Sequence, residues 1–248
     1  MLTIITGGSN GIGLATCQEL IKKDANNYCA IVDLVEPNFN LFKENNLDQI
    51  KYFQNDVSDH NSVIKCAKEI YNWKGNINTL VTCAGINIIH NSLEYKISDW
   101  NRIISVNLNG TFNWCQIASR YIKNNTNGGS IVTIGSIASK FGFVGRSAYT
   151  ASKLGVEGLV KVLSNEFAKY NIRVNCVSPG FTDTNLLREK LDEGVINLND
   201  LIKQNSIKRI ANSDEIANVI IFLLSDLSSY VTGQNIFVDG GFINNKMD

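Results

Sequence analysis

The 248-residue sequence has few of the features that mark secreted, metal-binding or nucleic-acid-binding proteins. Its 23 basic and 23 acidic side chains balance, so no excess positive charge would attract nucleic acid or anionic lipid. The six cysteines contain no Cys-x-x-Cys pair, which indicates reduced core residues rather than a metal site or a disulfide framework. We therefore assign no metal ligands and expect a cytoplasmic protein.

Long apolar segments and targeting sequences are also missing. The longest apolar run, residues 219–224, is far shorter than the ~20 residues needed to span a bilayer. No signal peptide is apparent before the first expected strand. The length suits a single α/β domain over residues 1–248, with no membrane association.

A short apolar run at residues 2–6 leads directly into the turn Thr6-Gly-Gly-Ser-Asn-Gly-Ile-Gly13. Glycines allow a tight turn and a close approach to a pyrophosphate, which the free N–H groups at the start of a helix then hold. The same glycine spacing also marks ordinary turns, but here it lies between an expected strand and an expected helix. The residues assigned to the cofactor in this turn are Gly7, Ser9, Asn10, Gly11, Ile12 and Gly13.

The next expected strand, Cys29-Ala-Ile-Val-Asp33, ends on a carboxylate. In dinucleotide-binding folds a carboxylate at this position accepts hydrogen bonds from the adenosine ribose hydroxyls. A 2′-phosphate would meet Asp33 as a like charge, at about 4 kcal/mol for two unit charges in a medium of dielectric constant ~20. Neither Asn10 nor Leu34 supplies a compensating positive charge, so we expect NAD rather than NADP. The alternative is that Asp33 only caps the strand.

Tyr149 and Lys153 are four residues apart in a segment rich in helix formers, so both side chains leave one face of a helix. An ammonium beside a phenol favours the phenolate and so lowers the pKa of the tyrosine, which suits proton transfer. Ser136 follows the apolar run at residues 131–134, which places its hydroxyl at the carboxyl end of a buried strand, where open α/β sheets bind ligands. Taken alone, the Tyr-Lys spacing would more often indicate a solvated helix face.

Together, Ser136, Tyr149-x-x-x-Lys153 and the glycine turn resemble the short-chain dehydrogenase/reductase family from residue 2 to about residue 242. The resemblance implies a Rossmann-like doubly wound domain with a mostly parallel, seven-stranded sheet and helices on both faces. It also implies that the serine orients the substrate oxygen and that the tyrosine transfers the proton. The lysine would hold the nicotinamide ribose and keep the tyrosine acidic.

The same resemblance suggests further cofactor contacts. Asp56 and Val57 would bracket the adenine, although Asp56-Val-Ser-Asp59 could simply begin a helix with Ser58 or Asp59 as its N-cap. Thr82-Cys83-Ala84-Gly85 occupies the place of the family's Asn-Asn-Ala-Gly and lacks both amides. Only Ala84 and Gly85 are carried over as cofactor contacts, and the structural role of the missing amides is left open.

Asn107 falls on the apolar stripe of an expected helix over residues 99–123. A buried amide needs hydrogen-bond partners. The resemblance implies that Asn107 is catalytic and holds a water that links Lys153 to solvent, whereas a purely structural asparagine would bond only to backbone.

The last functional segments follow the expected strand at residues 172–177. The resemblance assigns the nicotinamide end of the cofactor to Pro179, Gly180, Thr182 and Thr184. Residues 185–208 show no firm period and correspond to the family's substrate lid, which is typically a mobile element. Ser213-Asp-Glu215 begins another helix with an acidic first turn.

The resulting prediction is reversible hydride transfer between a secondary alcohol and NAD, with a small-molecule substrate. The alternatives are a 3-oxoacyl-(acyl-carrier-protein) reductase and a catalytically inactive NAD-binding regulator. The first is disfavoured because Asn127 and Tyr170 stand where such reductases carry basic residues, and the second because Tyr149 and Lys153 are both present. The family is usually tetrameric, which predicts a homotetramer packed through residues 99–123 and 147–170.

The substrate itself is not identified by the sequence. Arg146 and Lys140 could bind a carboxylate or phosphate, or could face solvent. The candidate pocket residues are Asn87, His90, Ala138, Phe143, Arg146 and Phe181.

Overall fold

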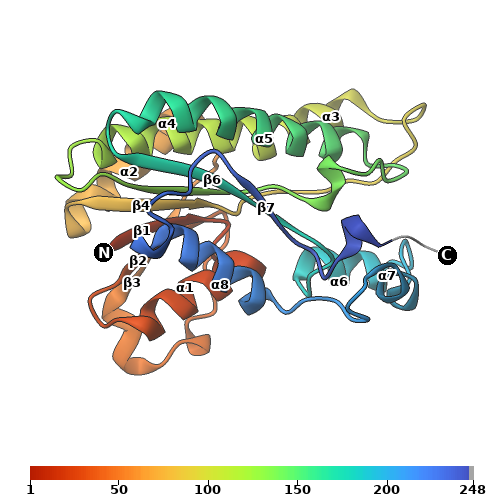
Figure 1. The fold of residues 1–248 in the computed structure, drawn as a ribbon, viewed down its shortest axis with the longest axis horizontal. Helices are drawn as coiled ribbons and strands as arrows, with labels where there is room; N and C mark the ends of the chain where they lie inside the picture. The colour runs from red at the N-terminus through yellow and green to blue at the C-terminus, as the bar shows by residue number, and fades with distance from the viewer. Residues whose placement is uncertain (246–248) are drawn as a thin grey trace.

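The computed structural model describes residues 1–245, which fold around one seven-stranded sheet (Figure 1). The last three residues of the expected domain, 246–248, lie outside the described residues. Neighbouring strands are all parallel, in the order β3-β2-β1-β4-β5-β6-β7. The expected Rossmann-like, doubly wound architecture is therefore confirmed. The strands are β1 (Leu2–Thr6), β2 (Tyr28–Asp33), β3 (Ile50–Gln54), β4 (Ile77–Thr82), β5 (Gly129–Ile134), β6 (Ile172–Pro179) and β7 (Asn235–Val238).

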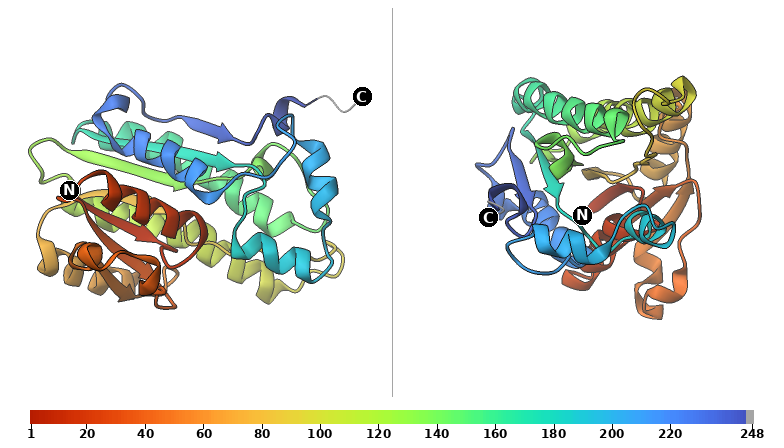
Figure 2. Two further views of the ribbon diagram at one scale, coloured as in Figure 1. Left: turned by 90° about the horizontal axis from the view of Figure 1, so that it is seen from below. Right: turned by 90° about the vertical axis from the view of Figure 1, so that its right-hand side faces the viewer.

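Helices cover both faces of the sheet, as Figures 1 and 2 show. One face packs against α2 (His60–Lys74), α4 (Gly110–Ile122) and α5 (Ser147–Ala168). The other packs against α1 (Gly11–Lys23) and α8 (Ser213–Leu224). Because both faces are buried, the central strands are apolar at consecutive positions rather than alternating.

The segment before α2 shows that Asp59, not Ser58, is the N-cap. The Asp59 carboxylate accepts hydrogen bonds from the backbone N–H groups of Asn61 and Ser62. Asp56 binds the N–H and hydroxyl of Ser58 instead. The helix entry predicted for this segment is therefore confirmed, and it leaves Asp56 free to lie beside the cleft described below.

The helix expected over residues 99–123 is present as an unbroken helical run from residue 97 to residue 122, but it is not α-helical throughout. It consists of α3 (Ile97–Ile103), a wider π-helical segment at Ile104–Asn109, and α4. The hydroxyl of Thr111 donates to the backbone oxygen of Asn107 at 2.8 Å, and the Asn107 side chain bonds to a neighbouring loop. Such wider turns are frequent at functional sites.

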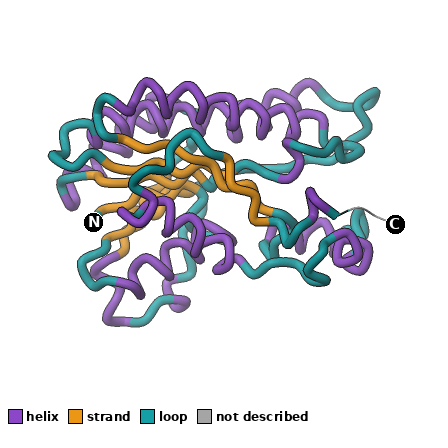
Figure 3. Tube along the Cα trace, in the orientation of Figure 1, coloured by secondary structure: helices purple, strands orange, loops and turns teal. Residues whose placement is uncertain are grey.

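The segment expected as a lid without firm periodicity contains two short helices, α6 (Asn185–Asp192) and α7 (Leu198–Gln204). Each begins at a capping side chain: Thr184 accepts from the N–H of Leu187, and Asn197 accepts from that of Asn199. Both helices lie together beyond the end of β6, away from the other helices (Figures 1 and 3). They are too short for a hydrophobic period to reveal them in the sequence.

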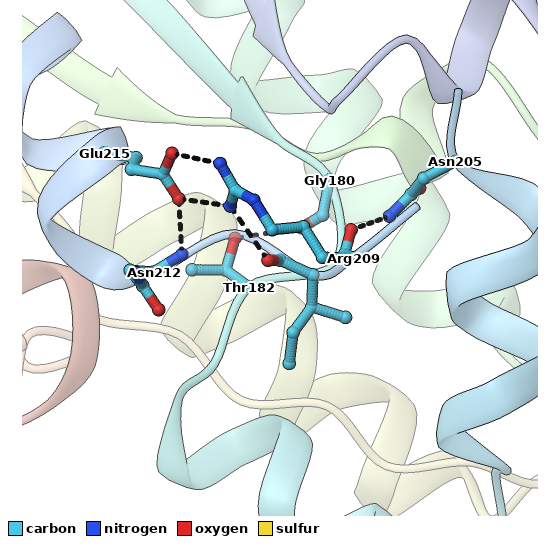
Figure 4. Close-up of polar contacts among 7 residues, drawn as sticks. Gly180, Thr182, Asn205, Arg209, Asn212 and Glu215 are labelled. Atoms are coloured by element: carbon cyan, nitrogen blue, oxygen red, sulfur yellow. Dashed lines mark hydrogen bonds and ion pairs between the residues drawn. The ribbon is translucent and has the colours of Figure 1, made fainter. Parts of the chain in front are cut away.

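Both ends of this segment join the fold at one place. The backbone N–H of Ala211 donates to Phe181, and that of Asp183 donates to Ala211, at 2.9 and 2.8 Å. The Arg209 guanidinium binds both carboxylate oxygens of Glu215 and the backbone oxygen of Ile210 (Figure 4). The base of segment 185–208 is therefore fastened to α8.

Glu215 also fixes the start of α8. The sequence places the helix start at Ser213, and the structure adds Asn212 as its N-cap, whose N–H donates to the Glu215 carboxylate at 2.8 Å. The Arg209 hydrogen bonds, followed by the Asn212 N–H, lower the pKa of Glu215 from 4.5 to about 2.

Glu215→Gln is expected to lower the melting temperature at pH 7 but not near pH 2. Because the pKa of Glu215 is lower in the folded chain, its ionised form stabilises the fold above about pH 4.5, and this contribution is lost as the pH falls toward 2. The ion pair is more than one-third exposed, so we expect a difference of about 1–3 °C. Thermal melts of both proteins from pH 7 to pH 2 test this, and a difference that stays constant with pH would contradict it.

Within residues 1–245, no helix combines the length and apolarity needed to cross a bilayer. All six cysteines are unpaired, and all but Cys83 are buried.

Candidate active site

A cleft of about 590 Å³ lies at the carboxyl ends of the central strands. Strand order reverses here, since β1 lies between β2 and β4, and open α/β sheets bind ligands at such a reversal. Of the catalytic and cofactor-binding residues assigned from the sequence, only Ser9 and Asn107 do not line it. Those that do are Gly7, Asn10, Gly11, Ile12, Gly13, Asp33, Asp56, Val57, Ala84, Gly85, Ser136, Tyr149, Lys153, Pro179, Gly180, Thr182 and Thr184.

The glycine turn leaves no room for side chains. Gly7 and Gly11 have φ of +63° and +52°, which favour glycine. A Cβ on Gly7 would lie 2.6 Å from the backbone nitrogen of Ala84, and one on Gly13 would lie 2.3 Å from the oxygen of Gly7. The backbone therefore borders the cleft directly at the start of α1, a cradle that fits the pyrophosphate of a dinucleotide.

Gly13→Ala is expected to weaken NADH binding about 5- to 150-fold, because the new methyl group must displace the turn at Gly7, and overpacking of this kind costs about 1–3 kcal/mol. Fluorescence titration with NADH measures the effect, and circular dichroism checks that the variant is folded. Gly142→Ala is the matched control, since a Cβ there meets nothing within 4 Å. Unchanged binding by a folded Gly13→Ala protein would contradict the cradle.

Asp33 is held at one end of the cleft by backbone donors. Its carboxylate accepts from the N–H of Ser9 at 3.1 Å and from that of Leu34 at 2.8 Å. The Ser9 hydroxyl donates to Val35, so Ser9 ties the glycine turn to the end of β2 instead of lining the cleft. Burial, and then the negative charges of Asp33 and Glu36, raise the pKa of Tyr52, which indicates a negative potential here.

Ser136, Tyr149 and Lys153 meet in the same cleft. Ser136 follows β5, and its Oγ accepts from the N–H of Ala138 at 3.1 Å. Tyr149 and Lys153 lie on α5, and the Lys153 ammonium is 5.7 Å from the centre of the Tyr149 ring. Lys153 is buried, and its Nζ donates to the backbone oxygen of Ile134 at 2.8 Å. The cation is thus fixed near the phenol by the strand that carries Ser136.

Asn107 is fully buried, and its side chain has three partners. Its Oδ1 accepts from the N–H of Ile86 at 2.8 Å, and its Nδ2 donates to the Ile86 oxygen at 3.0 Å and to Ser152 at 3.1 Å. The side chain does not line the cleft, and its bond to the Ser152 hydroxyl means that it is not held by backbone alone. A Cβ on Gly85 would lie 3.4 Å from Asn107 Oδ1 and 3.7 Å from Lys153 Nζ, which makes the two side chains neighbours. The water link to Lys153 stays a prediction.

Thr82 and Cys83, which replace the family's two amides, have uncharged side chains beside the cleft. Thr82 Oγ1 is buried without a hydrogen-bond partner among the described residues. Cys83 lines the cleft, and burial raises the pKa of its thiol to about 12 against the opposing effect of Lys153. This wall of the cleft is therefore uncharged.

The residues proposed for the substrate divide into two groups. Asn87, Arg146 and Phe181 line the cleft, whereas Ala138, Phe143, His90 and Lys140 do not. Phe143 instead packs against the rings of Phe181 and Phe242, and the His90 ring lies 3.9 Å from Asp99. Lys140 is exposed.

Sequence reasoning missed several lining residues. For segment 185–208, the apolar positions in the sequence were the signal that could have identified lining residues. The missed residues are Val32, Leu34, Asn55, Ser58, Cys83, Ile86, Arg102, Ser105, Val106, Ile134, Gly135 and Ile137, together with Asn185, Leu186, Leu187, Lys190 and Ile196 of segment 185–208. Across residues 1–245, no group of three or more His, Cys, Asp or Glu side chains is arranged to hold a metal ion.

Comparison with known proteins finds similarity over nearly the whole chain. A family model described as enoyl-(acyl carrier protein) reductase matches residues 7–243. The 3-oxoacyl-(acyl-carrier-protein) reductase of Thermotoga maritima is 36% identical, covering 97% of this chain and 96% of that protein. Carbonyl reductase family member 4 of Xenopus laevis is also 36% identical, covering 96% and 95%.

Two solved structures share the arrangement of the elements. Ligand-free aldohexose dehydrogenase of Thermoplasma acidophilum has a TM-score of 0.90 at 27% identity, covering all of this chain and 95% of that one. ElxO with NADP bound has a TM-score of 0.87 at 28% identity, covering 98% and 99%.

Proposed function

The chain is an oxidoreductase that belongs to the short-chain dehydrogenase/reductase family, and from this we propose that it interconverts a secondary alcohol and a ketone with NAD(H). The family binds a nicotinamide cofactor. The observation that carries the proposal is that Ser136, Tyr149 and Lys153 line the same cleft as the glycine turn. We further propose that residues 1–248 form one cofactor-binding domain, with residues 185–208 as its lid.

Each catalytic side chain of the cleft has its own role in the proposed reaction. The cofactor, when bound, accepts or supplies the hydride. In the oxidation direction Tyr149, as the phenolate, takes the proton of the substrate hydroxyl, and Ser136 donates a hydrogen bond to the same oxygen. The Lys153 ammonium would stabilise the phenolate and hold the nicotinamide ribose, and the backbone oxygen of Ile134 keeps this ammonium in place. These three side chains therefore orient the substrate oxygen and stabilise the charge that develops when its proton is transferred.

Asp33 supports NAD as the proposed form of the cofactor. Both of its oxygens accept backbone N–H groups, and no positive side chain of the described residues forms an ion pair with it. The ribose 2′-hydroxyl would meet an acceptor there, whereas a 2′-phosphate would meet a like charge. ElxO has been solved with NADP bound, so the two forms must be compared directly on this chain.

A 3-oxoacyl-(acyl-carrier-protein) reductase is the second candidate, and relatives with that name favour it. Tyr170 replaces a basic docking residue, but the ammonium groups of Lys123 and Lys169 lie 5.9 and 5.1 Å from its ring centre. An acidic carrier protein would therefore still meet positive charge there. An inactive regulator is disfavoured because Tyr149 and Lys153 both remain in the cleft.

The purified chain tests the proposal directly. Secondary alcohols, polyols and hydroxy acids are incubated with NAD, and 3-oxoacyl thioesters with NADH or NADPH, while NADH or NADPH absorbance is recorded. Turnover of an alcohol or a ketone supports the proposal. Binding of NADH without turnover of any alcohol, ketone or thioester would favour the regulator.

We also propose a homotetramer that packs through α4 and α5. Apolar side chains remain exposed on these helices, among them Phe112, Leu154 and Val162 at 37–54% exposure. Analytical ultracentrifugation of the full chain measures the assembly.

A further inference from the structure

Arg146 is a partly buried arginine without an anionic partner. It immediately precedes α5 and lines the cleft close to Tyr149. Its guanidinium makes no hydrogen bond or ion pair with any other residue in the part of the chain that the structure describes. Arg173, Arg188 and Arg209, by contrast, all bind oxygen atoms of the protein. The charge of Arg146 is therefore available to a ligand in the cleft.

The surroundings of Arg146 make an unpaired charge costly. Its guanidinium carbon lies 5.1 Å from the centre of the Phe143 ring. Burial lowers the pKa of Arg146, which shows that its charged form is partly removed from water. An arginine nevertheless remains protonated in proteins, so the charge persists in this setting. Because water solvates the Arg146 guanidinium only in part, a substrate anion bound to it would stabilise its charge.

The neighbouring cation in the lid is already neutralised. Lys190 also lines the cleft, but its Nζ contacts both carboxylate oxygens of Glu193, at 2.9 and 2.6 Å. Two other cations line the cleft: Lys153, which is assigned to the cofactor ribose, and Arg102, which is exposed to solvent. Arg146 is the partly buried cation of the cleft that neither the protein nor the proposed cofactor neutralises.

Besides Arg146, the part of the cleft proposed for the substrate has an apolar wall and one hydrogen-bond acceptor without a donor. Ile137, Phe181, Leu187 and Ile196 line the cleft and belong to one hydrophobic cluster. Asn87 lines the same cleft, and its buried Oδ1 has no hydrogen-bond partner among the described residues. Such a site suits a ligand with an apolar chain, one anionic group and a hydrogen-bond donor.

We propose that Arg146 binds the carboxylate of a short aliphatic hydroxy acid or oxo acid, an assignment that rests on the hydride-transfer function proposed above. A planar guanidinium matches a carboxylate through two parallel hydrogen bonds. A single cation beside an apolar wall fits a carboxylate with a short alkyl chain better than it fits a phosphate. The carboxylate changes no bond during the reaction; it fixes the alcohol carbon relative to Tyr149 and Ser136.

The first test measures binding without turnover. Butyrate, butyramide and inorganic phosphate are titrated into the enzyme loaded with NADH, and the cofactor fluorescence is followed. Butyrate is expected to bind and butyramide is not. Arg146→Met should weaken butyrate binding about 10- to 100-fold, because a charged hydrogen-bonded partner is lost. Arg146→Lys should restore part of it, and Lys140→Met, which removes an exposed charge outside the cleft, should change nothing.

The second test measures specificity. The substrates are 3-hydroxybutanoate, or another hydroxy acid found to turn over, and its neutral methyl ester, each with NAD. Arg146→Met should lower kcat/KM for the acid about 10- to 100-fold and leave that for the ester within about twofold.

The outcomes separate the two proposals. Equal loss for acid and ester, or butyrate binding that survives Arg146→Met, overturns the carboxylate assignment. Tighter binding of phosphate than of butyrate overturns it as well. Turnover of neutral alcohols alone would leave the oxidoreductase proposal standing and refute the role of Arg146. Butyrate binding that depends on Arg146, without turnover of any alcohol or ketone, would support the anion site and refute the proposed reaction.

Discussion

Tyr149→Phe is expected to reduce hydride transfer by about 100- to 10,000-fold while NADH binding stays within about twofold of the unchanged enzyme. The substitution removes one oxygen, the one that would carry the proton. The ring remains, so α5 and the position of Lys153 should be preserved. Single-turnover rates with a saturating alcohol substrate and NAD measure the chemical step, and NADH fluorescence measures cofactor binding.

Tyr230→Phe is the matched control for this prediction, because Tyr230 is fully exposed and lies outside the cleft. It should leave both quantities unchanged. If Tyr149→Phe keeps most of the wild-type rate, another group transfers the proton, and the proposed role of Tyr149 is wrong.

Replacement of Asp33 by alanine is expected to change cofactor preference by about 100- to 1000-fold. With Asp33 present, a 2′-phosphate meets a like charge, at about 4 kcal/mol for two unit charges in a medium of dielectric constant ~20. Without it, the N–H groups of Ser9 and Leu34 lose their acceptor and become free to bind a phosphate oxygen. We expect the ratio of kcat/KM for NAD over NADP to fall by this factor in Asp33→Ala, mainly through improved use of NADP.

Glu36→Gln tests whether nearby negative charge alone sets the preference. Glu36 is exposed, and its charge reaches the same region, since it contributes to the raised pKa of Tyr52. Its effect on the ratio should be less than about threefold, because exposed charges are well screened. Wild-type enzyme that uses NADP as well as NAD would refute the assignment, as would an Asp33→Ala variant with an unchanged ratio.

The sheet, the glycine turn, Asp33 and the Tyr149–Lys153 pair could be predicted because each is marked by residues close together in the sequence. The apolar run at residues 2–6 is β1, and the glycine turn follows it into α1. Tyr149 and Lys153 share a helix, so their common orientation follows from spacing alone. Asp33 ends a buried strand, which places it at the carboxyl edge of a parallel sheet.

Side-chain orientations that are set by residues far away in the sequence could not be predicted in this way. The orientation of the Asn107 amide is set by Ile86 and Ser152, which lie 21 and 45 residues away in the chain. Phe143 was proposed for the pocket, but its ring packs against Phe181 and Phe242, which lie 38 and 99 residues away in the chain. The residues of segment 185–208 that reach the cleft lie in the eight-residue helix α6, which is too short for periodicity to identify, or at Ile196 in the connection that follows it.

The way in which residues 184–210 are attached has a consequence for how this protein can diversify. The chain leaves the sheet at Phe181–Asp183 and returns beside the same residues at Ala211. Asn185 bonds to Asn10 of the glycine turn, and Ser206 and Ile207 bond to the backbone after β7. Insertions, deletions or an exchanged segment between Asn185 and Ser206 need not alter the strands, the glycine turn or α5. If this segment covers the substrate as proposed, exchanging it should change substrate range without changing Ser136, Tyr149 or Lys153.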